Sequence, residues 1–157
     1  MIGENRNTTR IEGSSKFGVI VVSADNVALT NFTILTHAPD YSYAGLYLNG
    51  TNYCNITDNI ISRAYYSCSI RLDDSSNNYL NQNIVQGVFL NHSSNNVLSQ
   101  NNIWRNGEFG SGITLAYSSG NIISQNDIEE NAGAGIWFYY SLSNVINKNN
   151  LVNNRKG

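Results

Sequence analysis

The chain has 157 residues, a formal net charge of −2 and 13% charged residues. This length suits one domain with a sizeable core. No cluster of Lys and Arg is present, so the electrostatic footprint of a nucleic-acid-binding protein is missing. No apolar stretch reaches transmembrane length, and we therefore expect no membrane span.

Asparagine supplies most of the polarity, with 27 residues in the chain. The phrase "SSNNYLNQNIV" at 75–85 returns as "SSNNVLSQNNI" at 93–103 and as "SSGNIISQNDI" at 118–128. Recurrence of one phrase at a spacing of roughly 20–25 residues is typical of solenoid proteins.

Aligned on itself, the chain divides into six units that begin at residues 18, 45, 69, 87, 112 and 135. Two apolar positions follow each start closely, as Val19 and Val21 do in the first unit and Val88 and Leu90 do in the fourth. Two more apolar positions follow 11 and 16 residues after each start. The number of residues varies only in the segment between the end of one unit and the start of the next, as in a coil with one variable loop per turn.

The pattern predicts an all-β protein, a parallel β-solenoid of about six rungs, as a single domain over 1–157. Short stretches such as Val88-Phe89-Leu90 alternate in and out with a period of two. Two further positions carry Asn in most units, and we expect stacked amides to form ladders there. We also expect these Asn to adopt the left-handed backbone of sharp turns. The ladder positions are Val27, Cys54, Asn78, Asn96, Asn121 and Asn144, and Phe32, Asn59, Asn83, Asn101, Asn126 and Asn149.

The phrases "GVFLNHSSNNVLSQNNI" and "GITLAYSSGNIISQNDI", with "IGENRNTTRIEG" near the start, resemble the NosD-type right-handed parallel β-helix repeat family. That family is commonly labelled periplasmic copper-binding protein and belongs with the carbohydrate-binding and sugar-hydrolase β-helices. The resemblance implies that the solenoid is a right-handed single-stranded parallel β-helix. Family members usually carry further N-terminal strands and a cap, so we expect a fragment that lacks N- and C-terminal caps. Uncapped rungs would favour end-to-end self-association.

An outward strand face follows from the alternation, because the second and fourth residues after each start point away from the core. Aromatic rings there can stack on sugar rings, and amides or carboxylates can bind the hydroxyls. The variable loops that enter this strand add further aromatic residues. The competing interpretation is that aromatic residues simply suit exposed strands. The candidate polysaccharide-binding residues are Tyr47, Arg71, Asp73, Phe89, Trp137 and Tyr139, with Tyr41, Tyr43, Tyr65, Tyr66, Trp104 and Phe109 from the loops.

Catalysis has weaker support. Asp73 and Asp74 are the candidate acids, but adjacent residues on a strand point in different directions. A non-catalytic module is favoured, and a polysaccharide lyase or glycoside hydrolase stays open as an alternative.

Copper ligands of the usual kinds are scattered along the sequence: His37, His92, Cys54, Cys68 and Met1. We therefore expect no metal site, no cofactor and no disulfide. The resemblance keeps open a role as a NosD-like accessory factor in copper-enzyme maturation.

Location is indicated by composition. Five N-x-S/T sequons begin at Asn7, Asn31, Asn49, Asn55 and Asn91. Together with low charge and many Tyr and Asn, they favour an extracellular, cell-surface or periplasmic protein. The expected function is polysaccharide binding or a role as a cell-surface scaffold, with polysaccharide or a cell-surface glycan as the partner.

Overall fold

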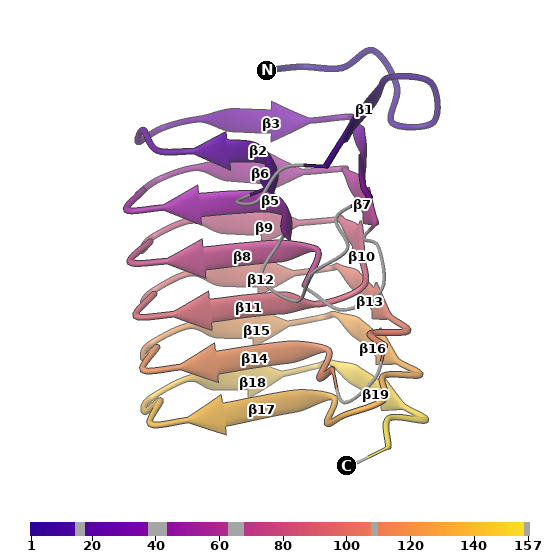
Figure 1. Cartoon of the computed structure of the whole chain (residues 1–157). Coiled ribbons are helices and arrows are strands. Elements are labelled where there is room, and N and C mark those ends of the chain that lie inside the picture. Colours follow the sequence, from indigo (N-terminus) through magenta and orange to yellow (C-terminus); the bar gives the residue numbers. More distant parts are fainter. Residues whose placement is uncertain (15–17, 38–43, 63–67, 108–109, 156–157) are drawn as a thin grey trace.

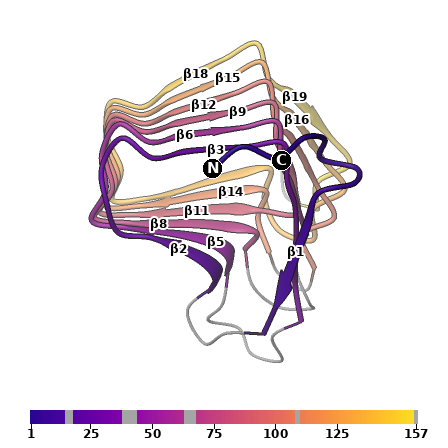
Figure 2. The same ribbon diagram turned by 90° about the horizontal axis from the view of Figure 1, so that it is seen from above.

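The computed structural model describes residues 1–14, 18–37, 44–62, 68–107 and 110–155 (Figure 1). These residues form strands and turns and contain no helix. The strands stack as a column of parallel coils, and three sheets line its sides (Figures 1 and 2). The predicted all-β solenoid is therefore confirmed. Its right-handed sense stays a prediction, which agrees with the general rule for parallel crossovers.

Each rung contributes one strand to each sheet. The front sheet contains β2 (Gly18–Val22), β5 (Ala44–Asn49), β8 (Ile70–Asp73), β11 (Val88–Asn91), β14 (Ile113–Ala116) and β17 (Ile136–Tyr139). The back sheet contains β3 (Ala28–Thr30), β6 (Asn55–Thr57), β9 (Tyr79–Asn81), β12 (Val97–Ser99), β15 (Ile122–Ser124) and β18 (Val145–Asn147). The side sheet contains β1 (Arg10–Gly13), β4 (Thr33–Thr36), β7 (Ile60–Ser62), β10 (Ile84–Val85), β13 (Asn102–Trp104), β16 (Asp127–Glu129) and β19 (Asn150–Val152).

The core is a stack of Ile, Leu and Val between the three sheets. Leu46, Leu72, Leu90 and Leu115 are fully buried, as the repeat pattern predicts. Like residues lie above like because paired strands keep one register, with Leu90 opposite Leu72 and opposite Leu115. Neighbouring strands are about 4.8 Å apart, so stacked side chains contact one another and the apolar core is continuous along the solenoid axis.

The register of the first rung was predicted wrongly by one residue. Val22 pairs with Leu48 and is 6% exposed, whereas Val21 pairs with Tyr47 and is 48% exposed. Val21 therefore points outward and Val22 inward, the reverse of the expectation. The first rung is one residue shorter between its front strand and β3, so counting from Gly18 gives the wrong residue. In the front strand of the first rung, apolar residues occupy both the inward and the outward positions, so no polar residue shows which side faces solvent.

The Asn ladders are confirmed as the devices that close two corners of each rung. The backbone N–H of Asn83 donates to Oδ1 of Asn101 at 3.0 Å, and its Nδ2 donates to the same oxygen at 3.1 Å. The same Nδ2 also donates to the carbonyl of Ile56 in the rung above, at 2.8 Å. The Asn83 side chain thus binds two backbone groups of the preceding rung, because its Oδ1 also accepts from the N–H of Asn59. Such groups would be costly to bury without partners.

The backbone conformation expected of the ladder Asn was wrong. No ladder Asn has a positive φ; the residue before it does, as with Asn77 (φ 60°) and Gln82 (φ 55°). The ladder Asn instead keeps a conformation that aims its side chain inward along the stack. The left-handed conformation is adopted by the exposed residue before the ladder Asn, and side chains of several kinds occur at that position.

Further ladders were missed. A hydroxyl ladder runs along the end of the front sheet through Thr51, Ser75, Ser93, Ser118 and Ser141, where the hydroxyl of each Ser accepts from the backbone N–H of the preceding member. A third Asn ladder, Asn106, Asn131 and Asn154, follows the side sheet. The available signal for the hydroxyl ladder was the Thr or Ser that stands six residues after the start of every unit from the second to the sixth.

Candidate functional site

The six candidate residues predicted on the strands lie on the outward face of the front sheet. Tyr47, Arg71 and Phe89 occupy successive strands of one column, which continues through Thr114 to Trp137. A second column runs beside it and contains Asp73 and, three strands further on, Tyr139. The sheet register therefore places these residues on one surface, but in two groups.

The first group, the arginine cluster, consists of Tyr47, Arg71, Asp73 and Phe89. Arg71 Nε and the hydroxyl of Tyr47 both donate to Oδ2 of Asp73, each at 2.9 Å. The guanidinium lies 5.2 Å from the ring centroid of Phe89 and 6.0 Å from that of Tyr47. Such a cation–π arrangement is favourable when partly desolvated. The faces of these two rings that Arg71 covers cannot also stack on a sugar.

Protonation in this cluster follows its contacts. Burial raises the pKa of the Tyr47 phenol, and the hydrogen bond to Asp73 raises it further. For Arg71, burial by itself would lower the pKa, but hydrogen bonding to Asp73 and its negative charge outweigh burial, so the pKa lies above its ordinary value. Arg71 therefore remains a cation and Tyr47 a neutral donor over the physiological pH range.

Asp73 is not placed as a free acid. Its side chain is 13% exposed, and Oδ2 is held by Arg71 and Tyr47. Oδ1 is buried and has no hydrogen-bond partner among the described residues. Asp74 is exposed and lies in the turn after β8 with a φ of 49°. The two carboxylates thus occupy different surroundings, one enclosed and one in solvent.

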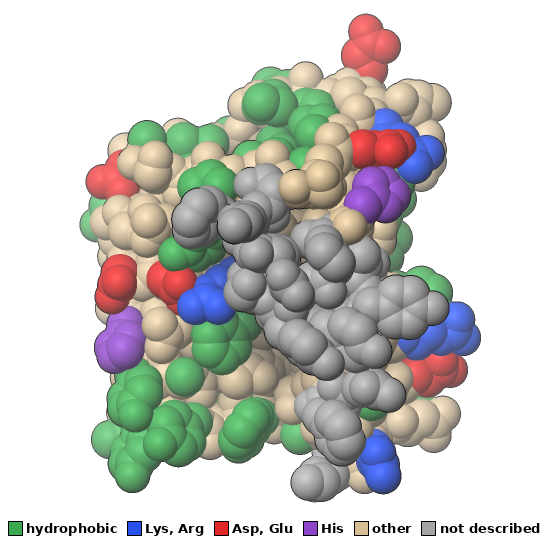
Figure 3. Space-filling model, in the orientation of Figure 1, with side chains coloured by type: hydrophobic (Ala, Val, Ile, Leu, Met, Phe, Trp, Pro, Cys, Tyr) green, Lys and Arg blue, Asp and Glu red, His purple; other side chains and the backbone are tan. Residues whose placement is uncertain are grey.

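The second group, the open aromatic cluster, consists of His92, Tyr117, Trp137, Tyr139 and Tyr140. Tyr117 stacks on His92 at 5.0 Å and on Tyr140 at 5.5 Å, with nearly parallel planes in both pairs. Tyr139 meets Tyr117 and Tyr140 edge to face. Hydrogen bonding to Tyr139, followed by burial, raises the pKa of the Tyr117 phenol. Hydrophobic side chains gather at this lower end of the front sheet (Figure 3).

The rings of this cluster differ in how much surface they offer. Both faces of Tyr117 are occupied by stacked neighbours. Tyr140 is 71% exposed and Trp137 is 55% exposed, so these two offer the largest accessible aromatic surface. An exposed aromatic patch of this kind on a soluble protein is a typical contact surface.

Three residues of the open aromatic cluster have a left-handed backbone conformation. His92, Tyr117 and Tyr140 have φ values of 47°, 50° and 46°. The second rung has Gly50 at the corresponding corner, with a φ of 64° and open space where a Cβ would lie. A bulky residue with positive φ is an outlier that costs free energy, and such outliers concentrate at functional sites.

Trp104 is not part of this surface. It lies in β13 of the side sheet, where the guanidinium of Arg105 covers it at 4.6 Å. Tyr41, Tyr43, Tyr65, Tyr66 and Phe109, which were expected to rim a groove, lie outside the described residues.

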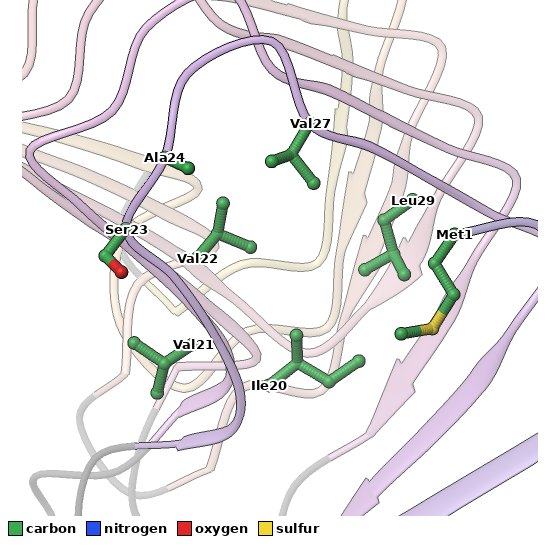
Figure 4. Close-up of a pocket in the computed structure, with 8 residues that line it drawn as sticks. All are labelled: Met1, Ile20, Val21, Val22, Ser23, Ala24, Val27 and Leu29. Carbon is green, nitrogen blue, oxygen red and sulfur yellow. The ribbon is translucent and has the colours of Figure 1, made fainter.

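A pocket opens at the N-terminal end of the column, away from the open aromatic cluster (Figure 4). Ile20, Val22 and Leu29 point into it, and the lining residues carry no acidic or basic side chain. Apart from the hydroxyl of Ser23 and the N-terminal amine of Met1, the lining is apolar and suits an apolar group. Its lining is Met1, Ile20, Val21, Val22, Ser23, Ala24, Val27 and Leu29.

Metal ligands do not come together in the described part of the chain. No three His, Cys, Asp or Glu side chains there form a group that could hold a metal ion. Cys54 and Cys68 are not bridged, and Cys54 is buried in the core. His92 stacks on Tyr117, and His37 lies on an exposed edge near Glu12. These residues do not fit a copper site, which needs clustered nitrogen or sulfur ligands.

Comparison with known families gives a match over most of the chain. The model of a family described as periplasmic copper-binding protein (NosD) matches residues 40–157. The chain belongs to this family. The part of this NosD-family chain that matches includes both clusters, from Tyr47 to Tyr140. Comparison with curated proteins and with solved structures found no match. In the described residues of this NosD-family chain, no helix is long and apolar enough to cross a membrane.

Proposed function

We propose that this protein is an extracytoplasmic β-solenoid module that binds polysaccharide through its open aromatic cluster. One observation carries the proposal: Trp137, Tyr139 and Tyr140 are exposed side by side at one end of the front sheet. A sugar ring presents apolar C–H faces, and the burial of these faces against an aromatic plane is favourable. The periplasmic description of the family supports the extracytoplasmic location.

Binding is tested with a panel of neutral polysaccharides. Trp104→Phe leaves Trp137 as the single fluorescent tryptophan, so a change in emission on titration reports the cluster directly. We expect saturable binding that Trp137→Ala abolishes and Tyr140→Ala weakens. Tyr53→Ala is the matched control, because Tyr53 is also exposed, at 64%, with a left-handed backbone, but lies at a corner of the second rung. Equal loss in the Tyr53 variant would contradict the proposal.

Turnover is measured on the same samples through new reducing ends or unsaturated products. We expect none, because Asp73 is tied to Arg71 and Tyr47. Products that disappear in Asp73→Asn or Asp74→Asn would instead support a polysaccharide lyase or glycoside hydrolase.

The family match favours a second candidate, a NosD-like accessory role in copper-enzyme maturation. Since no ligand cluster lies among the described residues, that role would not rest on them as the metal site. Equilibrium dialysis against copper tests this directly. Stoichiometric, tight copper retention by the purified protein would favour the accessory role over glycan binding.

The scaffold alternative rests on end-to-end self-association. It predicts that sedimentation velocity shows species that grow with protein concentration. A monomer at every concentration would count against it.

A further inference from the structure

Arg71 combines a fixed position with terminal N–H groups that no described residue accepts from. Its Nε is held by Asp73, and its guanidinium lies near two aromatic rings. Its terminal N–H groups have no acceptor among the described residues, and its side chain is 33% exposed. A guanidinium held in this way loses little rotamer entropy when it binds a ligand, because it is already oriented.

Arg71 and Trp137 belong to the same column on the front sheet. Phe89 and Thr114 lie between them, one residue on each intervening strand. Three steps of about 4.8 Å put the two ends of this surface about 14 Å apart along the solenoid axis. The intervening side chains are uncharged, and both are half-buried, so they leave a continuous shallow surface.

Charge on this face favours an uncharged ligand. Arg71 is compensated by Asp73, and Asp74 follows in the adjoining turn. The outward side chains of the described front strands carry one cation, Arg71, and one anion, Asp73, and with Asp74 in the adjoining turn they sum to −1 when His92 is neutral. The whole chain also carries a net charge of −2. A polyanion would be repelled, whereas the hydroxyls of a neutral sugar can accept from the guanidinium without a charge penalty.

We propose that the glycan bound by this protein is a neutral polysaccharide that lies along the solenoid axis, stacked on Trp137 at one end and hydrogen-bonded by Arg71 at the other. This inference rests on the proposed function and adds the ligand's charge class, its direction and its polar anchor. Arg71 reads hydroxyls through its terminal N–H groups, while Asp73 and the rings of Tyr47 and Phe89 hold it in place.

Chain length provides the test, because a disaccharide stacked on Trp137 is too short to reach Arg71 and a hexasaccharide is long enough. Isothermal titration with both lengths of a neutral oligosaccharide that the fluorescence panel identifies measures the difference. Arg71→Met should lower the affinity for the hexasaccharide by about tenfold, to the level of the disaccharide, and leave disaccharide affinity unchanged. Arg71→Lys should lose most of the same increment, because the planar fork is lost although the charge remains.

Arg105→Met is the matched control, since Arg105 also pairs through Nε with a carboxylate and covers an aromatic ring, but on the side sheet. It should leave both affinities unchanged. If Arg71→Met unfolds the protein, the double variant Arg71→Met/Asp73→Asn removes the ion pair together, and circular dichroism confirms folding before titration.

The outcomes separate the two proposals. Hexasaccharide affinity that is unchanged by every Arg71 variant, but lost in Trp137→Ala, overturns this inference and leaves the proposed function. A polyuronate that binds more tightly than the neutral chain, with affinity that falls as salt rises, overturns the neutral class. Failure of all oligosaccharides and polysaccharides to bind overturns both.

Discussion

The interior ladders and the outward columns of the front sheet belong to the same rungs but repeat in different ways. Asn83, Asn101 and Asn126 keep one residue type and one hydrogen-bond pattern from rung to rung. The outward column changes at every strand, from Tyr47 to Arg71 to Phe89. The difference teaches that constancy marks what the coil needs to close its turns, whereas variation marks surface that folding leaves free for recognition.

The front face itself repeats this contrast at a smaller scale. In the arginine cluster the side chains satisfy one another, through Asp73 and the rings beside Arg71. In the open aromatic cluster Trp137 and Tyr140 remain largely accessible. The first cluster is therefore built to hold a guanidinium still, and the second to offer apolar surface.

The largest expected effect is loss of a ladder amide. Asn83→Ala leaves the buried backbone N–H of Asn59 without its acceptor and removes the side-chain donor to the carbonyl of Ile56. An unsatisfied buried group costs about 1–3 kcal/mol, so we expect roughly that much destabilisation. Urea unfolding measures it. Asn55→Ala, at an exposed position of the neighbouring strand, is the control and should change stability by less than about 0.5 kcal/mol. Equal effects would remove the distinction between ladder and surface Asn.

A smaller effect is expected at the strained corner of the open aromatic cluster. Tyr140 has a φ of 46°, a conformation that costs an L-residue about 1–2 kcal/mol relative to glycine. Tyr140→Gly should therefore be more stable than Tyr140→Ala by about 1 kcal/mol in thermal or urea unfolding. Both variants should bind polysaccharide less tightly than the parent. A glycine variant no more stable than the alanine variant would mean that the corner is not strained.

The arginine cluster gives a pH-dependent prediction. The folded state holds the Tyr47 proton more tightly than the unfolded chain, because burial and Asp73 raise its pKa above 10.0. The corresponding stability is fully present below pH 10 and is lost as pH rises through the folded-state pKa. Tyr47→Phe should therefore flatten the decline of unfolding free energy above pH 10, measured by urea unfolding over a pH series. Parallel declines in both proteins would contradict it.

The smallest expected effect on stability comes from the residue with the largest expected effect on binding. Trp137→Ala should change the free energy of unfolding by no more than about 0.5 kcal/mol, because its ring is 55% exposed. Unfolding curves recorded beside those of Asn83→Ala make the comparison direct. Destabilisation above about 2 kcal/mol would identify Trp137 as part of the framework instead of a recognition surface.

Much of the coil could be predicted because its determinants are local and repeated. The inward positions of Leu72, Leu90 and Leu115 follow from period-two alternation within one strand, and like residues must stack if identical turns repeat. The ladder positions of Asn83 and Asn101 follow for the same reason. The inward residues of the first rung were predicted wrongly because Val27 and Phe32 replace the ladder Asn there, and one fewer residue separates the front strand from β3.

The sequence by itself therefore determined the parallel coil, its core, its two main ladders and the face on which the candidate residues lie. Only the tertiary structure decided how these residues divide between a closed and an open cluster. Arg71 covers Phe89, and Tyr117 is enclosed by His92 and Tyr140, through contacts between residues 18 to 25 positions apart. The physical reason is that alternation sets only the side of a strand on which a residue lies. Which rings stay open depends on the rotamers and charges of neighbours that stacking of the rungs brings together.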